Sequence, residues 1–233
     1  MCFDLDSHPP IRPIAGGAID AMQLILTAAD RNRFAAYRTR AAEPNGAGVV
    51  ILPDVRGLHP YYEELSLRFA ENGIDALAFD WFGRTAGAEP RGDGFDHSPH
   101  VTQTTWRGIQ ADLTAAVEEL RTPEDGRSAP GSLFTIGFCM GGRMSFLAGT
   151  LGLGLAGEIK SPVLGLFGGG DAAITAEAIA AFDDGLTAAS VDHRLVTYPG
   201  APHSFFDRKM PEFADASAAA WDEVLAFIRA RTA

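Results

Sequence analysis

Residues 133–149, LFTIGFCMGGRMSFLAG, decide the fold of this 233-residue chain. Their first part, LFTIGF, is a short apolar run, which is typical of a buried strand in a parallel sheet. Their last part, residues 143–149, is rich in small residues and is expected to be helical. Gly137 and Gly141 stand two positions before and after Cys139, so the chain is predicted to turn sharply from strand to helix at this cysteine.

This G-x-C-x-G pattern is a nucleophile elbow in which cysteine replaces serine. The glycines are needed because larger side chains two positions away would clash in so strained a turn. The N-terminus of the following helix favours a thiolate, and the backbone N–H of Met140 is placed to donate to an oxyanion. We therefore predict that Cys139 is a nucleophile. The alternative is a structural cysteine buried in a packed strand–helix turn.

Outward from the elbow, short apolar runs alternate with helical patterns. The runs lie at residues 48–52, 74–79, 162–167 and 194–198, and the helical patterns at 60–73, 102–121, 176–189 and 213–231. Residues 23–27 and 33–40 are expected to form a hairpin. This alternation predicts an α/β fold, a mostly parallel sheet flanked by helices on both faces. We expect one domain over residues 21–233, with residues 1–20 packing on it as an N-terminal extension.

Ligands of parallel sheets bind beyond the carboxyl ends of the strands, which draws attention to two further residues. Asp171 follows the run at 162–167, and His203 follows the run at 194–198. The chain order nucleophile, acid, base is the order of an α/β-hydrolase. His203 would move the proton of Cys139, and Asp171 would fix the imidazole tautomer. Alternatively, Asp171 caps the next helix and His203 is a turn residue without a role.

Composition and charge exclude several other classes of protein. The net charge is 19 − 30 = −11, which disfavours nucleic acid or an anionic membrane as the main partner. No uncharged apolar stretch reaches 18 residues, and no secretory signal is visible, so neither a membrane nor export is expected. The only two cysteines stand in different contexts, so we expect no disulfide and a cytoplasmic location. The pair His97 and His100 flanks Pro99 in a polar loop, so no metal site is expected.

Five segments resemble the dienelactone hydrolase family. They are LPDVRG at 52–57, DWFGR at 80–84, the GFCMGG elbow, PVLGLFGGGD at 162–171 and PHSFF at 202–206, and the likeness runs from about residue 20 to the C-terminus. The resemblance implies an α/β-hydrolase fold without a cofactor. It implies hydrolysis of an enol lactone or another activated ester through an acyl-thioester on Cys139.

The resemblance also implies roles for residues around the nucleophile. The N–H of Val55 would be the second oxyanion donor, and Asp54 stands where the family usually has a glutamate that contacts the thiol. Arg84 matches an arginine that binds a substrate carboxylate in the family. A second such arginine lies four residues after the histidine, where this chain has Asp207, and Arg208 follows one residue later.

Two other functions stay open at this point. The protein could be a general carboxylesterase or thioesterase-like hydrolase, or a non-catalytic module that binds a small molecule. The expected partner is a small ester or lactone, and the expected assembly is a monomer or a small homo-oligomer. The connection at 151–161 is shorter than in the family, so we expect residues to be omitted between Gly157 and Glu158.

Overall fold

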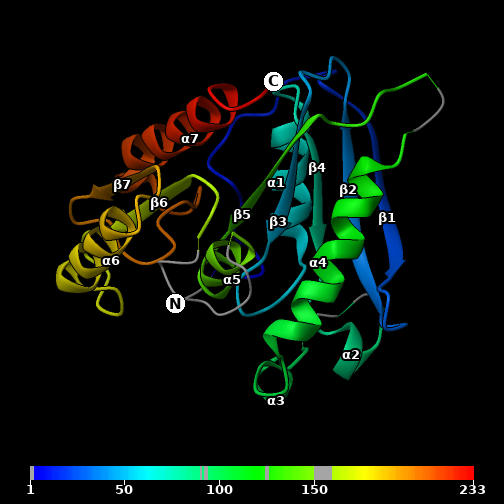
Figure 1. Cartoon of the computed structure of the whole chain (residues 1–233), viewed down its shortest axis with the longest axis horizontal. Coiled ribbons are helices and arrows are strands. Elements are labelled where there is room, and N and C mark those ends of the chain that lie inside the picture. Colours follow the sequence, from blue (N-terminus) through cyan, green and yellow to red (C-terminus); the bar gives the residue numbers. More distant parts are fainter. Residues whose placement is uncertain (1–2, 90, 92–93, 124–125, 150–158) are drawn as a thin grey trace.

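The computed structural model of the chain describes residues 3–89, 91, 94–123, 126–149 and 159–233 (Figure 1). Strands β1 (Ala18–Thr27) and β2 (Arg33–Ala41) form the predicted antiparallel hairpin, in which Leu26 lies opposite Phe34. Arg31 turns the chain between them with a positive φ of 70°. Strand β1 begins earlier than expected, at Ala18, inside the segment expected to be an extension.

The central part of the sheet is parallel. Strands β3 (Ala47–Leu52), β4 (Asp75–Phe79) and β5 (Ser132–Gly137) complete a five-stranded sheet in the order β1-β2-β4-β3-β5. Every residue of β3 is buried, because successive side chains point to opposite faces and both faces are covered. The predicted α/β fold with helices on both faces is therefore confirmed.

Helices connect the strands and cover the sheet. Helix α1 (Pro60–Ala70) links β3 to β4, and α4 (Trp106–Arg121) precedes β5 after an N-cap by the Thr105 side chain. The polar segment before α4 contains two short helices, α2 (Gly83–Ala86) and α3 (Ser98–Val101). None of the helices among the described residues combines the length and apolar character that crossing a membrane requires.

The sheet is divided after β5. Strands β6 (Val163–Gly168) and β7 (His193–Tyr198) form a separate parallel pair, connected by α6 (Ala176–Ala188). The division coincides with the short connection noted in the sequence. The omission expected between Gly157 and Glu158 lies outside the described residues.

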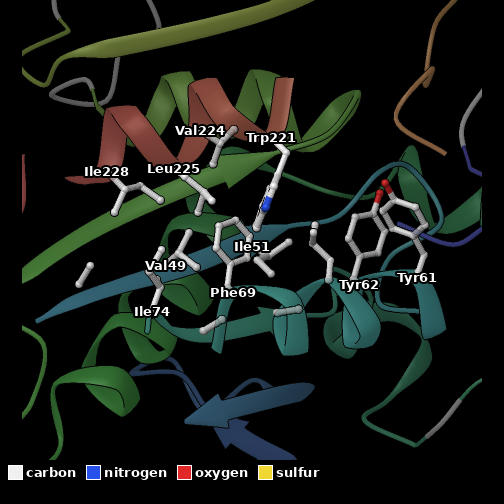
Figure 2. Close-up of a cluster of buried hydrophobic side chains, with 14 of the residues drawn as sticks. Val49, Ile51, Tyr61, Tyr62, Phe69, Ile74, Trp221, Val224, Leu225 and Ile228 are labelled. Atoms are coloured by element: carbon white, nitrogen blue, oxygen red, sulfur yellow. The ribbon is translucent and has the colours of Figure 1, made fainter. Parts of the chain in front are cut away.

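Helix α7 (Ala214–Arg229), which follows the short 3-10 helix η2 (Pro211–Phe213), joins the two sheets. Its Trp221, Val224, Leu225 and Ile228 pack with α1, β3 and β4 in the main apolar core (Figure 2). The rings of Phe69 in α1 and Trp221 lie 4.8 Å apart. The same core includes partly buried Leu164 and Leu166 of β6, so α7 holds the second sheet against the first.

The opposite face of the sheet carries α4 and α5 (Met140–Ala148). Ile109, Leu113 and Leu120 of α4 recur at helical spacing and pack on Val50 and Leu52 of β3. Met140 and Met144 of α5 reach the same apolar cluster from beside β5. The elbow helix is therefore anchored in the core next to the strand that precedes it.

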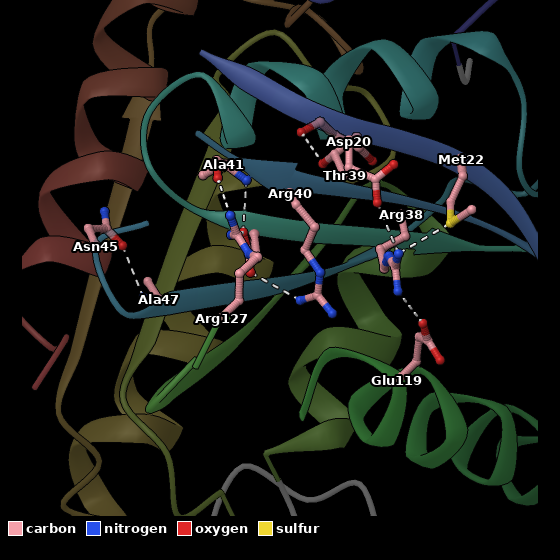
Figure 3. Close-up of polar contacts among 12 residues, drawn as sticks. Asp20, Met22, Arg38, Thr39, Arg40, Ala41, Asn45, Ala47, Glu119 and Arg127 are labelled. Carbon is pink, nitrogen blue, oxygen red and sulfur yellow. Dashed lines mark hydrogen bonds and ion pairs between the residues drawn. The ribbon is translucent and has the colours of Figure 1, made fainter. Parts of the chain in front are cut away.

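A buried ionic cluster lies at one end of the sheet. Figure 3 labels three of its residues, Arg40, Ala41 and Arg127. The carboxylate of Asp75, at the start of β4, accepts hydrogen bonds from Arg40 (3.0 Å), Arg127 (3.2 Å) and the backbone N–H of Ala41 (2.9 Å). Its side chain is only 2% exposed. The Arg40 side chain is almost as deeply buried as this carboxylate, so removing the carboxylate would take a charged partner away from a buried guanidinium.

We therefore expect Asp75→Ala to lower the free energy of unfolding by about 3 kcal/mol, as measured by urea denaturation. The control is Glu223→Ala, which removes the exposed ion pair with Arg194 and should cost less than about 1 kcal/mol. Equal losses in the two variants would show that the cluster at Asp75 contributes no more than a surface pair.

Candidate active site

The elbow forms as the glycine spacing predicts. Strand β5 ends at Gly137, α5 begins at Met140, and Cys139 stands between them with φ 54° and ψ −114°. A side chain other than glycine is strained at this positive φ, by about 1–3 kcal/mol. Such strain is common at functional sites, and the exposed Cys139 is placed at the N-terminus of the helix.

The elbow packs directly against the loop that follows β3. A Cβ at Gly141 would lie 2.0 Å from the carbonyl oxygen of Leu52 and 2.2 Å from that of Pro53. The N–H of Phe138 donates to the same Leu52 oxygen at 3.2 Å. Only glycine allows this contact between backbones. It brings residues 53–57, which we call the β3 loop, beside Cys139.

Asp171 and His203 meet at the carboxyl ends of β6 and β7. The Oδ2 atom of Asp171 lies 2.6 Å from Nδ1 of His203. Because an ionised carboxylate only accepts, Nδ1 must carry the proton, and this leaves Nε2 of the imidazole as an acceptor. The arrangement therefore gives His203 the tautomer that a general base requires.

The Asp171 carboxylate is held in its ionised form. Burial would raise the pKa of Asp171, but hydrogen bonds from His203 and from the backbone N–H groups of Ala173 and Ile174 outweigh it, so the pKa is lowered. The interaction with His203 is therefore present at neutral pH and is lost only as the pH falls through this lowered pKa. Thr175, whose hydroxyl accepts from the N–H of Ala178, is the N-cap of α6. Asp171 therefore does not cap this helix.

Two loops approach each other closely, which allows Asp171 to contact His203. Gly168 at the end of β6 lies opposite Tyr198 in register with β7. A Cβ at Gly168 would lie 2.4 Å from the oxygen of Ala201 and 2.6 Å from that of Pro202. The glycine therefore lets the loop that carries Asp171 lie against the loop that carries His203.

Cys139, Asp171 and His203 line one cavity of about 1310 Å³. The cavity runs between β5 and β6, where the sheet is divided, and all residues of both strands contribute to its lining. The structure thus brings together around one space the three residues that the sequence placed at strand ends.

The other predicted residues have different surroundings. Asp54 is fully buried in the β3 loop, where its carboxylate accepts from the backbone N–H groups of Phe3 (3.1 Å) and Arg56 (2.9 Å). Val55 lies between Asp54 and Arg56, and Met140 is the first residue of α5. Their N–H groups as oxyanion donors stay a prediction.

Two predicted substrate-binding arginines already have carboxylate partners. Arg84 pairs with Asp112 at 2.8 Å and with Asp30, and Arg208 pairs with Glu64 at 2.7 Å. Neither arginine belongs to the described lining of the cavity. Their positions give no support to the expectation that they bind a substrate carboxylate.

Sequence reasoning missed several residues that line the cavity, among them Phe3 and Arg143. Arg143 stands four residues after Cys139, on the next turn of α5, and this spacing was visible in the sequence. Phe3 is brought to the site by tertiary contacts with Tyr61 and Phe138, which no local pattern reveals.

Comparison with known proteins gives a consistent assignment. The sequence model of the dienelactone hydrolase family matches residues 34–232. A Synechocystis protein named "Putative carboxymethylenebutenolidase" is 25% identical over 240 residues, which cover 88% of this chain and 96% of that protein. A Salmonella typhimurium protein of the same name is 26% identical over 222 residues, or 82% of this chain and 80% of that protein.

Solved structures share the fold. A dienelactone hydrolase-like promiscuous phosphotriesterase from metagenomic libraries superimposes with a TM-score of 0.75 at 22% identity, and the match covers 93% of this chain and 100% of that one. A structure from Klebsiella pneumoniae, described as a dienelactone hydrolase with the qualifier "Putative", gives a TM-score of 0.72 at 21% identity, covering 91% and 99%.

The contact at Gly141 generates a stability test. Gly141→Ala should lower the free energy of unfolding by about 3 kcal/mol, because the new methyl group meets two backbone oxygens that cannot move independently. The corresponding fall in melting temperature is about 6–12 °C for a domain of this size. Gly131→Ala is the matched control, since nothing lies within 4 Å of a Cβ there. If both variants have the same melting temperature, the elbow does not need the close approach of the backbones at Gly141.

Proposed function

Because the chain belongs to the dienelactone hydrolase family, and is thus a hydrolase, we propose that it cleaves an activated ester or enol lactone through Cys139, His203 and Asp171. The observation that carries this proposal is the 2.6 Å hydrogen bond between Asp171 and His203 at a cavity that the strained Cys139 also lines. A partnered imidazole and an exposed sulfur at a helix N-terminus are the parts that thiol catalysis needs.

The first half of the reaction would acylate the cysteine. Nε2 of His203 accepts the proton of the Cys139 thiol, and the sulfur attacks the carbonyl carbon of the ester. The C=O electron pair moves onto oxygen and returns as the C–O bond to the leaving group breaks. His203 then gives its proton to the departing oxygen, so that an alcohol or enol leaves and a thioester stays on Cys139.

The second half would hydrolyse the thioester. Nε2 of His203 takes a proton from water, the hydroxide oxygen attacks the thioester carbon, and the thiolate leaves. The acid product departs, and the proton returns to the sulfur. Asp171 keeps the same tautomer of His203 throughout and stabilises its charged form.

Two backbone N–H groups would stabilise the oxyanion in both halves. Met140 supplies one from the start of α5, and Val55 supplies the other from the β3 loop, which lies against the elbow at Gly141. One such donor is typically worth about 3 kcal/mol in the transition state. A thiolate is itself a good leaving group, so esters with a stabilised leaving oxygen, such as enol lactones, are the preferred substrates.

Arg143 supports a carboxylate-bearing substrate. Arg143 is an exposed cation that lines the cavity, and among the described residues its guanidinium has no carboxylate partner. The backbone N–H of Arg143 donates to the carbonyl oxygen of Cys139 at 3.3 Å, so Arg143 lies one helical turn after Cys139. Helical side chains lean toward the N-terminus, so its guanidinium leans toward the Cys139 end of the helix.

The nucleophile is tested by exposing the protein briefly to p-nitrophenyl acetate and measuring its intact mass. We expect one acetyl adduct, which peptide mapping places on Cys139, and rapid labelling of Cys139 but slower labelling of Cys2 by iodoacetamide. Cys139→Ala should form no adduct and should lose ester hydrolysis. Full hydrolysis by this variant would remove Cys139 from the reaction, whereas binding of esters without any turnover would favour the non-catalytic alternative.

Substrate preference is tested with two esters of the same leaving group, one neutral and one carrying a carboxylate on its acyl part. Arg143→Gln should lower kcat/KM for the anionic ester by about 10- to 100-fold and leave the neutral ester unchanged, because only the charge-assisted hydrogen bond is lost. Arg84→Gln is the control, since it breaks the pairs with Asp30 and Asp112. If Arg84→Gln, and not Arg143→Gln, loses the preference for the anionic ester, Arg84 has the carboxylate-binding role that the family resemblance implies.

A further inference from the structure

The N-terminal strap, residues 3–9, lies beside the β3 loop, and Phe3 is one of its buried residues. The side chain of Phe3 is 2% exposed. Its ring stacks on Tyr61 with centroids 3.9 Å apart and meets Phe138, the residue before Cys139, edge to face at 5.7 Å. Phe3 also contributes to the lining of the cavity that contains Cys139.

The backbone of Phe3 is bound by both neighbours of Val55. Its N–H donates to Oδ2 of Asp54, and its carbonyl oxygen accepts from Nη1 of Arg56. The second oxygen of Asp54 accepts from the N–H of Arg56 itself. Phe3 therefore links the side chain of the residue before Val55 to the side chain of the residue after it. The peptide group that carries the N–H of Val55 is also held through its carbonyl, that of Asp54, which accepts from Trp81.

Asp54 is fully occupied in this arrangement. Its N–H donates to the hydroxyl of Tyr62 at 2.8 Å, and its carbonyl accepts from Nε1 of Trp81 at 2.7 Å. Both carboxylate oxygens are used by the strap and the loop, as a buried carboxylate requires. The residue that replaces the glutamate of the family thus holds the backbone of the loop in place.

We propose that Phe3 and Asp54, together with Arg56, are positioning residues for the oxyanion donor Val55. This inference rests on the proposed function, because the N–H of Val55 matters only if an oxyanion forms at Cys139. A donor must lie about 2.7–3.1 Å from the oxyanion, and a misplacement of about 1 Å can cost about 100-fold in rate. The N-terminal strap would therefore act on acyl transfer without touching the sulfur.

The test compares two reactions of the same sulfur. Acylation by p-nitrophenyl acetate passes through an oxyanion, whereas alkylation by iodoacetamide displaces iodide at a saturated carbon and forms none. Arg56→Ala removes the donor to Phe3 but keeps the backbone N–H that binds Asp54. We expect its single-turnover acylation rate to fall by about tenfold or more, with the alkylation rate and the KM for ester unchanged.

Three further variants sharpen the result. Asp54→Asn removes one carboxylate acceptor and should show the same selective loss. Arg56→Lys keeps a donor that can reach the Phe3 carbonyl and should recover most of the acylation rate. Asp6→Asn is the control within the strap: it removes the exposed ion pair of Asp6 with Lys209, away from the β3 loop. It should leave both rates unchanged.

Each outcome bears on one claim. Arg56→Ala with the acylation rate of the unsubstituted protein overturns the positioning role. So does an equal fall of acylation and alkylation, because that would mean that the sulfur or the whole fold is disturbed. If the unsubstituted protein is alkylated but never acylated, the proposed function fails. That result is recognised before any strap variant is measured.

Discussion

The contact between the backbones of the elbow and the β3 loop is the constraint on which the rest depends. Gly141 brings the first turn of α5 against the carbonyl groups of Leu52 and Pro53. No side chain can fill this position, so the strand, the turn and the helix have only one way to pack. The same contact lies two residues after the strained Cys139 and brings the β3 loop beside the turn that carries the sulfur. Fold and candidate chemistry therefore depend on one pair of touching backbones.

The sequence predicted the parts of the site that are encoded locally. Strands and helices followed from hydrophobic periodicity, and the elbow followed from the spacing of Gly137 and Gly141 around Cys139. Asp171 and His203 could be found because parallel strands deliver the residues after their carboxyl ends to one edge, and their hydrogen bond confirms that the two meet. Each of these inferences uses only neighbours in the chain and the general geometry of a parallel sheet.

The surroundings of the charged residues could not be predicted in this way. Arg84 is held by Asp30 and Asp112, and Asp54 by the N-terminal strap, through contacts between residues 28 to 54 positions apart. No periodic pattern marks such pairs, since any exposed arginine could form them. A residue that matches a family position can thus have a new partner, and its role then changes with that partner.

The divided sheet adds a condition on how the site is assembled. Cys139 follows β5 in one sheet, whereas Asp171 and His203 follow β6 and β7 in the other, and within the described residues the two sheets are not hydrogen-bonded to each other. Among the described residues, apolar contacts join them instead: Trp221 and Val224 of α7 pack in the main core and line the cavity, and Phe146 of α5 packs against Phe182 of α6. Apolar packing is less directional than a ladder of hydrogen bonds. A hydrogen bond within the second sheet joins Asp171 to His203, whereas the placement of this imidazole relative to the sulfur depends on apolar packing across the division.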